Sequence, residues 1–223
     1  AVLGEMLLSR AAAGTTPVVL TGDGGDEISL GYQHVLAHSV TENRLFRQPL
    51  GFAIKTVSPL LNRRSEGYFT PAFKADRFLR GAKSVDLIER DFAWRGSFDW
   101  DSVCRLVPGA DQDDFKRFIA KQSAVVPSAH DFPDWRDRWS FLYLSSYLPN
   151  VILKKVDRAS MRFGVEARSP LLDRRVVESA LTMSPRERRS YQGAKLPILH
   201  SLRKATGRRL ASPTKHGMGM PVV

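Results

Sequence analysis

Three carboxylates stand within five residues of one another in a glycine-rich segment near the start of the chain. They are Asp23, Asp26 and Glu27. The apolar run at 18–20 just before them predicts a short, buried β-strand, and open α/β sheets bind ligands beyond the carboxyl ends of such strands. Carboxylates that converge there would suit a site for phosphate and a divalent metal ion, although acidic turns are also common on protein surfaces.

Glycines separate these acidic side chains. They are Gly22, Gly24 and Gly25. Because glycine has no Cβ, it adopts positive φ readily and lets the backbone approach a ligand closely. We therefore expect the three glycines to line a nucleotide.

A second group of charged residues occupies 154–173, at the start of a predicted helix and before a Ser-Pro pair. Its members are Lys155, Asp157, Arg158, Glu166 and Arg168. Each of them alone could be a solvated charge or part of a structural ion pair. A further charge, Lys215, stands in the proline- and glycine-containing segment 213–222. A lysine ammonium is a compact positive charge that suits a developing phosphate or oxyanion, but a single lysine is more often only a surface residue.

Taken together, three segments resemble, in order and spacing, the synthetase domain of glutamine-dependent asparagine synthetases. They are TGDGGDE at 21–27, KVDRASMRFGVEARSPLLD at 155–173 and PTKHGMGMP at 213–221. The sequence between them is also similar, so the resemblance covers 1–223 as a partial synthetase domain. It implies an α/β fold of the adenine-nucleotide α-hydrolase-like (ATP-pyrophosphatase) type, here with one or two parallel strands and a mostly helical remainder.

The resemblance also implies a reaction. The side-chain carboxylate of aspartate attacks the α-phosphate of ATP and gives an acyl-adenylate and pyrophosphate. Mg²⁺ neutralises the phosphates in that step. Ammonia from glutamine then attacks the adenylate, which gives asparagine and AMP.

Carried over residue by residue, the family's loop assigns roles to four positions of this chain. Thr21 and Gly22 are expected to lie along the nucleotide. Asp26 is expected to hold Mg²⁺ with pyrophosphate. Asp23 takes the position of an acidic residue that orients or deprotonates the attacking nitrogen.

The other two segments imply a lysine and a charged network. Lys215 is expected to contact the phosphates or the acyl-adenylate. The expected network, which shapes the nucleotide and substrate pocket, consists of Asp157, Glu166 and Arg168. The chain departs from the family at Leu30, which replaces a glycine and puts the path of the loop into Tyr32 in question, and at Met218, which replaces a phenylalanine.

Two parts of the family pattern do not occur in these 223 residues: an amino-terminal glutaminase domain and the SGGxDS pyrophosphate loop. We therefore expect the sequence to be the carboxyl-terminal part of a synthetase domain, inactive by itself, with the upstream part on the same chain or on a partner.

Two other functions remain open. Related adenylating enzymes, such as β-lactam synthetases and lasso-peptide cyclases, share this domain with a different acceptor. The β-lactam branch has a tyrosine at the position of Asp23, so an acid there favours ammonia as the nucleophile. The third hypothesis is an interaction module that has lost catalysis, against which the intact GDGGDE segment and Lys215 argue.

The net charge of +11 lies entirely in the last third of the chain, since 154–223 holds 16 Lys and Arg against 5 Asp and Glu. These cations lack the interleaved aromatics of a nucleic-acid stacking surface, and a positive field also suits ATP, pyrophosphate and an acidic amino acid. No apolar run reaches the roughly 18 residues of a membrane span. Cys104 is the only cysteine and has no nearby histidine, so we expect a half-buried helical thiol in a cytoplasmic protein.

For the elements that position these residues, apolar spacing predicts helices over 33–50, 51–62, 71–81 and 85–95. Residues 1–16 predict a helix that leads into the strand at 18–20. Prolines and glycines predict irregular structure over 105–133. Pro149-Asn150 predicts a break in the chain's helical structure, and the aromatic residues of 135–147 predict core packing.

Overall fold

A computed structural model describes residues 2–43, 71–96, 98, 100–190 and 193–208. The chain forms two compact units. Unit 1 contains 1–32 and 140–223, and unit 2 contains 33–139. The helix expected over 51–62 lies outside the described residues. Within the described part, no helix combines the length and apolar character that crossing a membrane requires.

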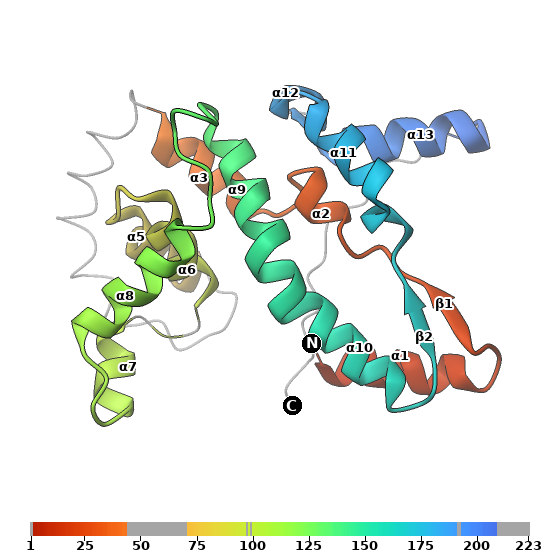
Figure 1. Cartoon of the computed structure of the whole chain (residues 1–223), viewed down its shortest axis with the longest axis horizontal. Helices are drawn as coiled ribbons and strands as arrows, with labels where there is room; N and C mark the ends of the chain where they lie inside the picture. Colours follow the sequence, from red (N-terminus) through yellow and green to blue (C-terminus); the bar gives the residue numbers. More distant parts are fainter. Residues whose placement is uncertain (1, 44–70, 97, 99, 191–192, 209–223) are drawn as a thin grey trace. The chain divides into compact units, whose positions relative to one another are not determined.

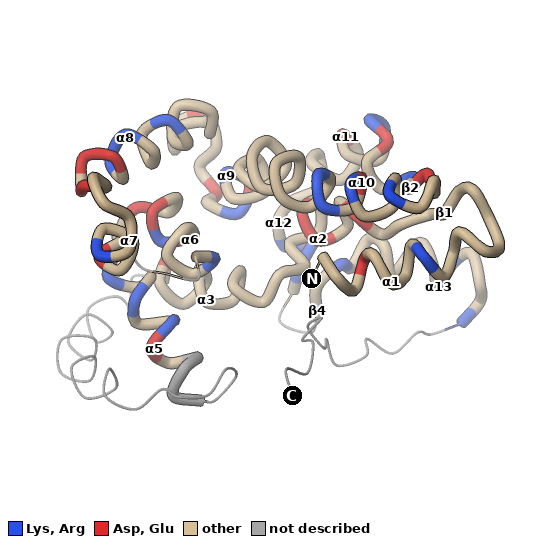
Figure 2. The backbone as a smooth tube through the Cα atoms, turned by 90° about the horizontal axis from the view of Figure 1, so that it is seen from below, with Lys and Arg blue, Asp and Glu red and all other residues tan. Residues whose placement is uncertain are grey.

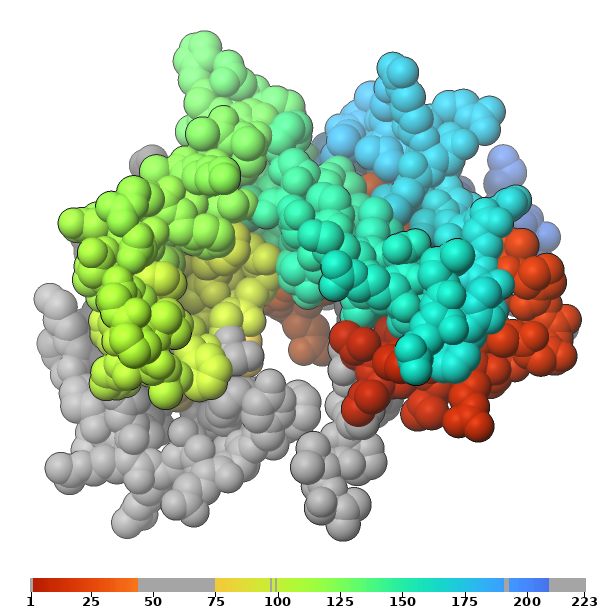
Figure 3. All heavy atoms as spheres, turned by 60° about the horizontal axis from the view of Figure 1, so that its bottom comes forward, coloured from red at the N-terminus to blue at the C-terminus, as the bar shows by residue number. Residues whose placement is uncertain are grey.

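Unit 1 begins with α1 (Val2–Ala13), which confirms the helix expected before the first strand. It packs against α10 (Lys154–Met161), and the two helices lie side by side (Figures 1 and 3). Lys155 Nζ stands 2.7 Å from Glu5 Oε1 and links the two helices by an ion pair. The helix pair thereby fixes the chain segments that lead into the strands.

Two short parallel strands form a small sheet, which confirms the strand expected at 18–20. β1 (Val18–Leu20) and β2 (Glu166–Arg168) pair with Leu20 opposite Arg168. The Thr21 amide donates to the Arg168 carbonyl at 2.8 Å and extends the ladder by one bond. The expected burial is wrong for Leu20, which is 75% exposed. Parallel strands are buried where both faces are covered, and among the described residues β1 pairs with β2 alone.

The chain does not break at Pro149, contrary to the sequence-based prediction. A π-helix, η1 (Tyr143–Leu153), runs through the proline and continues into α10. Proline has no N–H and clashes with the carbonyl four residues earlier in an α-helix, whereas the wider π turn accommodates it. The predicted aromatic core is confirmed for Trp139 and Tyr143, which are fully buried, but Phe141 is 37% exposed.

The remainder of unit 1 consists of short elements around a small hairpin. They are α2 (Gly25–Ile28), η2 (Pro170–Leu172), α11 (Arg174–Thr182), α12 (Pro185–Arg188), β3 (Arg189–Ser190), β4 (Gly193–Ala194) and α13 (Leu196–Thr206). Strands β3 and β4 are antiparallel. Basic residues occur near the start and middle of α10 (Figure 2) and near the end of α13, at Arg203 and Lys204.

Unit 2 is helical throughout its described part. Its helices are α3 (His34–Glu42), α5 (Pro71–Ala82), α6 (Leu87–Arg95), α7 (Trp100–Leu106), α8 (Gln112–Ser123) and the first residues of α9 (Trp135–Leu142). The helices expected over 71–81 and 85–95 are confirmed. Irregular structure was expected over 105–133, but α8 occupies its centre. Asp111 and Asp114 form a reciprocal capping box that satisfies the first amides of α8.

A buried polar cluster joins α3, α6 and α9 in unit 2. The Arg90 Nε–H donates to His38 Nδ1 at 3.1 Å, so His38 carries its proton on Nε2 and donates to Asp91 Oδ1 at 3.2 Å. The Trp139 indole also donates to Asp91, at 3.0 Å. Burial would raise the pKa of Asp91, but its hydrogen bond from His38 and the charge of Arg95 lower it. Burial lowers the pKa of His38, against the effect of Asp91.

This cluster predicts a loss of stability in mild acid. Because the pKa of His38 is lower in the folded than in the unfolded state, the unfolded chain binds one more proton below about pH 6.5. The free energy of unfolding should therefore fall as the pH drops from about 7 to 5, by at most about 1.4 kcal/mol per pH unit for this group. The other charges that face it, namely His34, Glu42, Arg90, Asp91 and Arg95, do not reverse this sign.

Urea unfolding at several pH values measures the effect. His38→Gln should flatten the dependence between pH 7 and 5, whereas His130→Gln, at a fully exposed site, should leave it intact. An unchanged slope in His38→Gln would show that another group carries it. Asp91 affects stability in a separate, more acidic pH range. Because its pKa is lowered in the folded state, the stability that it contributes is lost only as the pH falls below its ordinary pKa near 3.8.

Candidate active site

The parallel pairing of β1 and β2 brings together hydroxyl and carboxylate groups at the strands' carboxyl ends. Since Leu20 and Arg168 are opposite one another, the next residues, Thr21 and Ser169, also become neighbours. Their hydroxyl oxygens are 2.8 Å apart. Thr21 Oγ1 also donates to Asp23 Oδ2 at 2.8 Å. The sequence analysis singled out Thr21 and Asp23 but missed Ser169, whose partner lies 148 positions away.

The three glycines of the loop differ in what surrounds them. Gly24 has φ 87°, and a Cβ there would lie 2.1 Å from Leu172. A Cβ on Gly25 would lie 2.9 Å from Leu171. Close packing against η2 thus explains why both are glycine. Gly22 has no atom within 4 Å of its Cβ position, so its backbone is open to a ligand among the described residues.

Asp26 forms an ion pair with a lysine that the sequence analysis did not consider. Lys195 Nζ lies 2.9 Å from Asp26 Oδ1. Lys195 precedes α13 and has φ 60°, a left-handed conformation that is uncommon for residues other than glycine. Strained backbone of this kind persists where its surroundings fix it. The side chains of Asp26 and Lys195 are partly exposed, so the pair is accessible to solvent.

The third carboxylate, Glu27, points away from this site. Glu27 is 2% exposed, and Tyr32 donates to its Oε1 at 2.7 Å. Burial raises the pKa of Glu27 against the effect of that bond, and burial also raises the pKa of Tyr32. The expected convergence of three carboxylates is therefore wrong for Glu27, because it packs inward beside Tyr143 and Tyr147, whose rings contact Tyr32.

Leu30, which stands where the resembling family has a glycine, adopts a backbone conformation typical of glycine. Leu30 has φ 53°, the left-handed conformation that a glycine adopts readily, and its side chain is fully buried. The Arg189 guanidinium donates to the Leu30 carbonyl and holds this turn. Burial lowers the pKa of Arg189, whereas the charge of Asp26 raises it. Hydrophobic burial and one arginine therefore offset the strain at Leu30.

The other residues expected at the site are spread out. Arg168 Nε lies 2.8 Å from Glu166 Oε1 in an exposed pair on β2. Asp157 is exposed on α10, and among the described residues no hydrogen bond or ion pair joins it to that pair. Lys215 lies outside the described residues. The structure thus brings Thr21, Asp23 and Ser169 together, and pairs Asp26 with Lys195.

The family model described as asparagine synthase matches residues 3–223. The chain belongs to the asparagine synthase family. Searches of curated proteins and of solved structures gave no match. Membership of the asparagine synthase family makes the chain a ligase-type protein of ATP-dependent amide formation, consistent with its parallel strand pair and mostly helical remainder.

The side chains near the strand ends could bind a metal ion only together with phosphate oxygens and water. In the described part of the chain, no three His, Cys, Asp or Glu side chains gather closely enough to hold a metal ion by themselves. Mg²⁺ at nucleotide sites often takes only one or two carboxylates, with phosphate oxygens and water completing its shell. Asp26, partly exposed on α2, fits as one such ligand.

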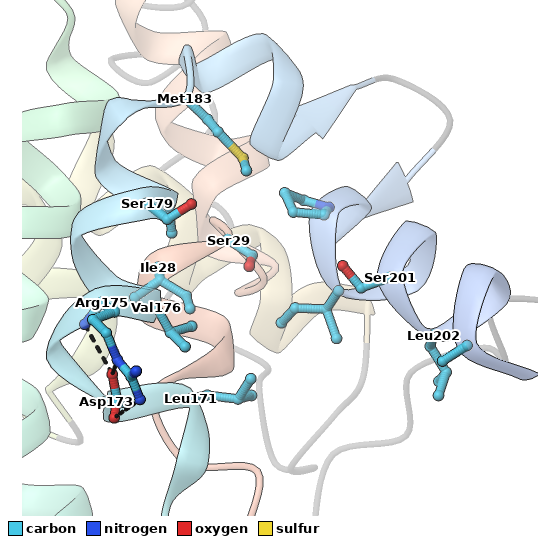
Figure 4. Close-up of a pocket in the computed structure, with 14 residues that line it drawn as sticks. Ile28, Ser29, Leu171, Asp173, Arg175, Val176, Ser179, Met183, Ser201 and Leu202 are labelled. Carbon is cyan, nitrogen blue, oxygen red and sulfur yellow. Dashed lines mark hydrogen bonds and ion pairs between the residues drawn. The ribbon is translucent and has the colours of Figure 1, made fainter.

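An apolar pocket of about 780 Å³ lies between α2, α11 and α13 (Figure 4). Ile28, Val176 and Met183 line it, together with the hydroxyls of Ser29 and Ser201. Neither Asp23 nor Asp26 lines it. Its charged groups, Asp173 and Arg175, bind one another at 3.1 Å. Among the described residues that line this pocket, the charged side chains are therefore already paired with one another.

Gly31→Ala should disable the asparagine synthase site. A Cβ on Gly31 would stand 1.9 Å from Asp26 Oδ1 and 2.8 Å from Lys195 Cε, so the ion pair must move. We expect a loss of stability of about 1–3 kcal/mol from overpacking and a loss of ATP–pyrophosphate exchange at temperatures where the variant is folded. Gly4→Ala, whose Cβ meets no atom within 4 Å in α1, is the matched control and should be neutral or stabilising. Full exchange in Gly31→Ala would contradict a role for this pair.

Proposed function

We propose that this asparagine synthase family member adenylates the side-chain carboxylate of aspartate and transfers ammonia to it, giving asparagine, AMP and pyrophosphate. One observation carries the proposal. Two carboxylates of one loop are held differently at the end of a parallel strand: Asp23 by a hydroxyl and Asp26 by a lysine. A reaction with one phosphate step and one nitrogen step needs two such groups.

The adenylation step is assigned to Asp26, Lys195 and the backbone at Gly22. Mg²⁺, with Asp26 as one ligand, would neutralise the phosphates and the pyrophosphate that leaves. Lys195 stabilises the negative charge that grows on those phosphates, since its ammonium is compact and partly exposed. Gly22 offers open backbone along which the nucleotide can lie. Lys215 is proposed to add a second positive charge from the tail.

The amide-forming step is assigned to Asp23. Its Oδ2 accepts the Thr21 hydroxyl, while Oδ1 has no hydrogen-bond partner among the described residues. When ammonia attacks the acyl carbon, the nitrogen becomes positive and must lose a proton. We assign the acceptance of that proton to Asp23 Oδ1, after which the acyl carbon expels AMP.

Further assignments follow from the family resemblance. Ammonia is proposed to come from glutamine, through a glutaminase domain on the same chain or on a partner. The exposed Glu166–Arg168 pair and Asp157 are proposed to border the pocket for the nucleotide and the acidic substrate. The guanidinium of Arg168, at the end of β2, suits recognition of a carboxylate by two parallel hydrogen bonds.

The test is the substrate dependence of pyrophosphate release by the full-length protein with ATP and Mg²⁺. We expect release with aspartate and asparagine formation when ammonium or glutamine is added. Release that needs another carboxylic acid instead of aspartate would indicate a relative of the β-lactam synthetase or lasso-cyclase type. No ATP turnover with any carboxylic acid or peptide would favour a non-catalytic interaction module.

A further inference from the structure

Ser169 occupies a position at which a serine side chain usually caps the turn that follows it. It precedes Pro170, the first residue of η2, and so stands at the amino-terminal cap of that turn. Serine side chains at such positions commonly accept a hydrogen bond from the following backbone amides. The Ser169 side chain makes no capping bond. Its hydroxyl is directed instead to Thr21 on the neighbouring strand, at 2.8 Å.

The hydrogens in this group can be assigned by counting. An ionised aspartate only accepts hydrogen bonds, and each hydroxyl has one hydrogen to donate. The Thr21 hydrogen goes to Asp23 Oδ2. Ser169 must therefore donate to the Thr21 oxygen, which gives a directed chain from Ser169 through Thr21 to Asp23.

We propose that Ser169 is a positioning residue for amide formation, which acts on Asp23 through Thr21. The proposal rests on the function proposed above, in which Asp23 accepts the proton of the attacking nitrogen. A hydroxyl that already accepts a hydrogen bond is a stronger donor, because hydrogen bonds in a chain polarise one another. Ser169 thus strengthens the bond to Oδ2 and fixes the Thr21 rotor, which holds Asp23 in one orientation and leaves Oδ1 as the oxygen that accepts the proton. No proton moves along the chain.

The hydrogen bond between Thr21 and Ser169 also connects the loop after β1 to the end of β2. Asp23 belongs to the loop after β1, whereas Ser169 follows the Glu166–Arg168 pair at the end of β2. Any change at β2 that shifts Ser169 therefore alters the orientation of Asp23. The adenylate and the attacking ammonia are then aligned only when both strand ends are in place.

The test measures how the adenylate is partitioned in the full-length protein. Asparagine and AMP are both quantified with saturating aspartate, ATP and ammonium, and ATP–pyrophosphate exchange is measured separately. In Ser169→Ala we expect amide formation to fall about tenfold, the size of one lost hydrogen bond. Exchange should stay within about twofold, so more AMP forms per asparagine as water intercepts the adenylate.

Three further variants make the result specific. Ser169→Thr keeps the hydroxyl and should restore the AMP-to-asparagine ratio. Thr21→Val breaks the chain at its centre and should raise the ratio, and adding Ser169→Ala to it should change nothing more, because coupled residues are not additive. Ser145→Ala removes a hydroxyl bound only to backbone carbonyls and is the control for a serine lost elsewhere.

The outcomes separate this proposal from the one on which it rests. If the unaltered protein releases no pyrophosphate with aspartate, the proposed function fails. If it does, and Ser169→Ala keeps the original ratio, the positioning role is wrong. Equal losses in exchange and amide formation would make Ser169 a structural residue, and additive effects of Ser169→Ala and Thr21→Val would exclude the chain between them.

Discussion

Asp26→Asn is expected to reduce aspartate-dependent ATP–pyrophosphate exchange by about 10²–10³-fold, the usual loss when one electrostatic stabiliser of a transition state is removed. The substitution keeps the shape of the side chain but removes the negative charge offered to Mg²⁺. It also releases Lys195, whose ammonium lies 2.9 Å from Asp26 in the protein without nucleotide. Any glutaminase activity of the full-length protein should be unaffected.

Glu178→Gln is the matched control, since it removes one carboxylate from an exposed i,i+4 pair on α11 and should leave exchange unchanged. If Asp26→Asn kept exchange near the original rate, Asp26 would be a loop residue and the metal assignment would fail. A loss of exchange that accompanies a large drop in melting temperature would instead identify a structural role.

Asp23→Asn should separate the two chemical steps. We expect exchange to continue, because the adenylate forms without this group, while transfer of ammonia falls by about 10²–10⁴-fold, the range for loss of a general base. The amide of asparagine still accepts the Thr21 hydrogen bond but cannot take up the proton of the attacking nitrogen. AMP should then accumulate with little asparagine.

Lys215→Ala provides the opposite pattern. Its charge is expected to act where phosphate negativity grows, so exchange should fall by about 10²–10³-fold, and amide formation only in consequence. Equal damage to exchange in Asp23→Asn and Lys215→Ala would place both residues in one step. The assignment of Asp23 to amide formation and of Lys215 to adenylation would then be wrong.

Local sequence patterns predicted several of the helices and the first strand. Apolar spacing predicted α5 and α6, the segment before the first strand predicted α1, and the run at 18–20 predicted that strand. The α8 capping box was also readable, since Asp111 stands three residues before Asp114, but nearby prolines and glycines drew attention to irregular structure. At Pro149 the local rule applies to an α-helix, whereas the chain forms a π-helix there, which that rule does not cover.

Only the part of the site that lies in the loop after β1 could be predicted from the sequence. Thr21, Asp23 and Asp26 lie in one short segment that follows a strand, so their types and spacing pointed to chemistry. Ser169 and Lys195 were not predictable in the same way, because their roles depend on strand register and on a turn before α13 that no local pattern encodes. The inward rotation of Glu27 likewise follows from its contact with Tyr32 inside the fold.

The most direct measurement of the central claim follows oxygen from aspartate. Aspartate labelled with ¹⁸O in its side-chain carboxylate is incubated with the full-length protein, ATP, Mg²⁺ and ammonium, and the AMP and asparagine are analysed by mass spectrometry. Attack of the carboxylate on the α-phosphate transfers one labelled oxygen, so we predict one ¹⁸O in each AMP formed with asparagine. Unlabelled AMP, or ¹⁸O found in inorganic phosphate with ADP as the nucleotide product, would contradict adenylation of the aspartate side chain.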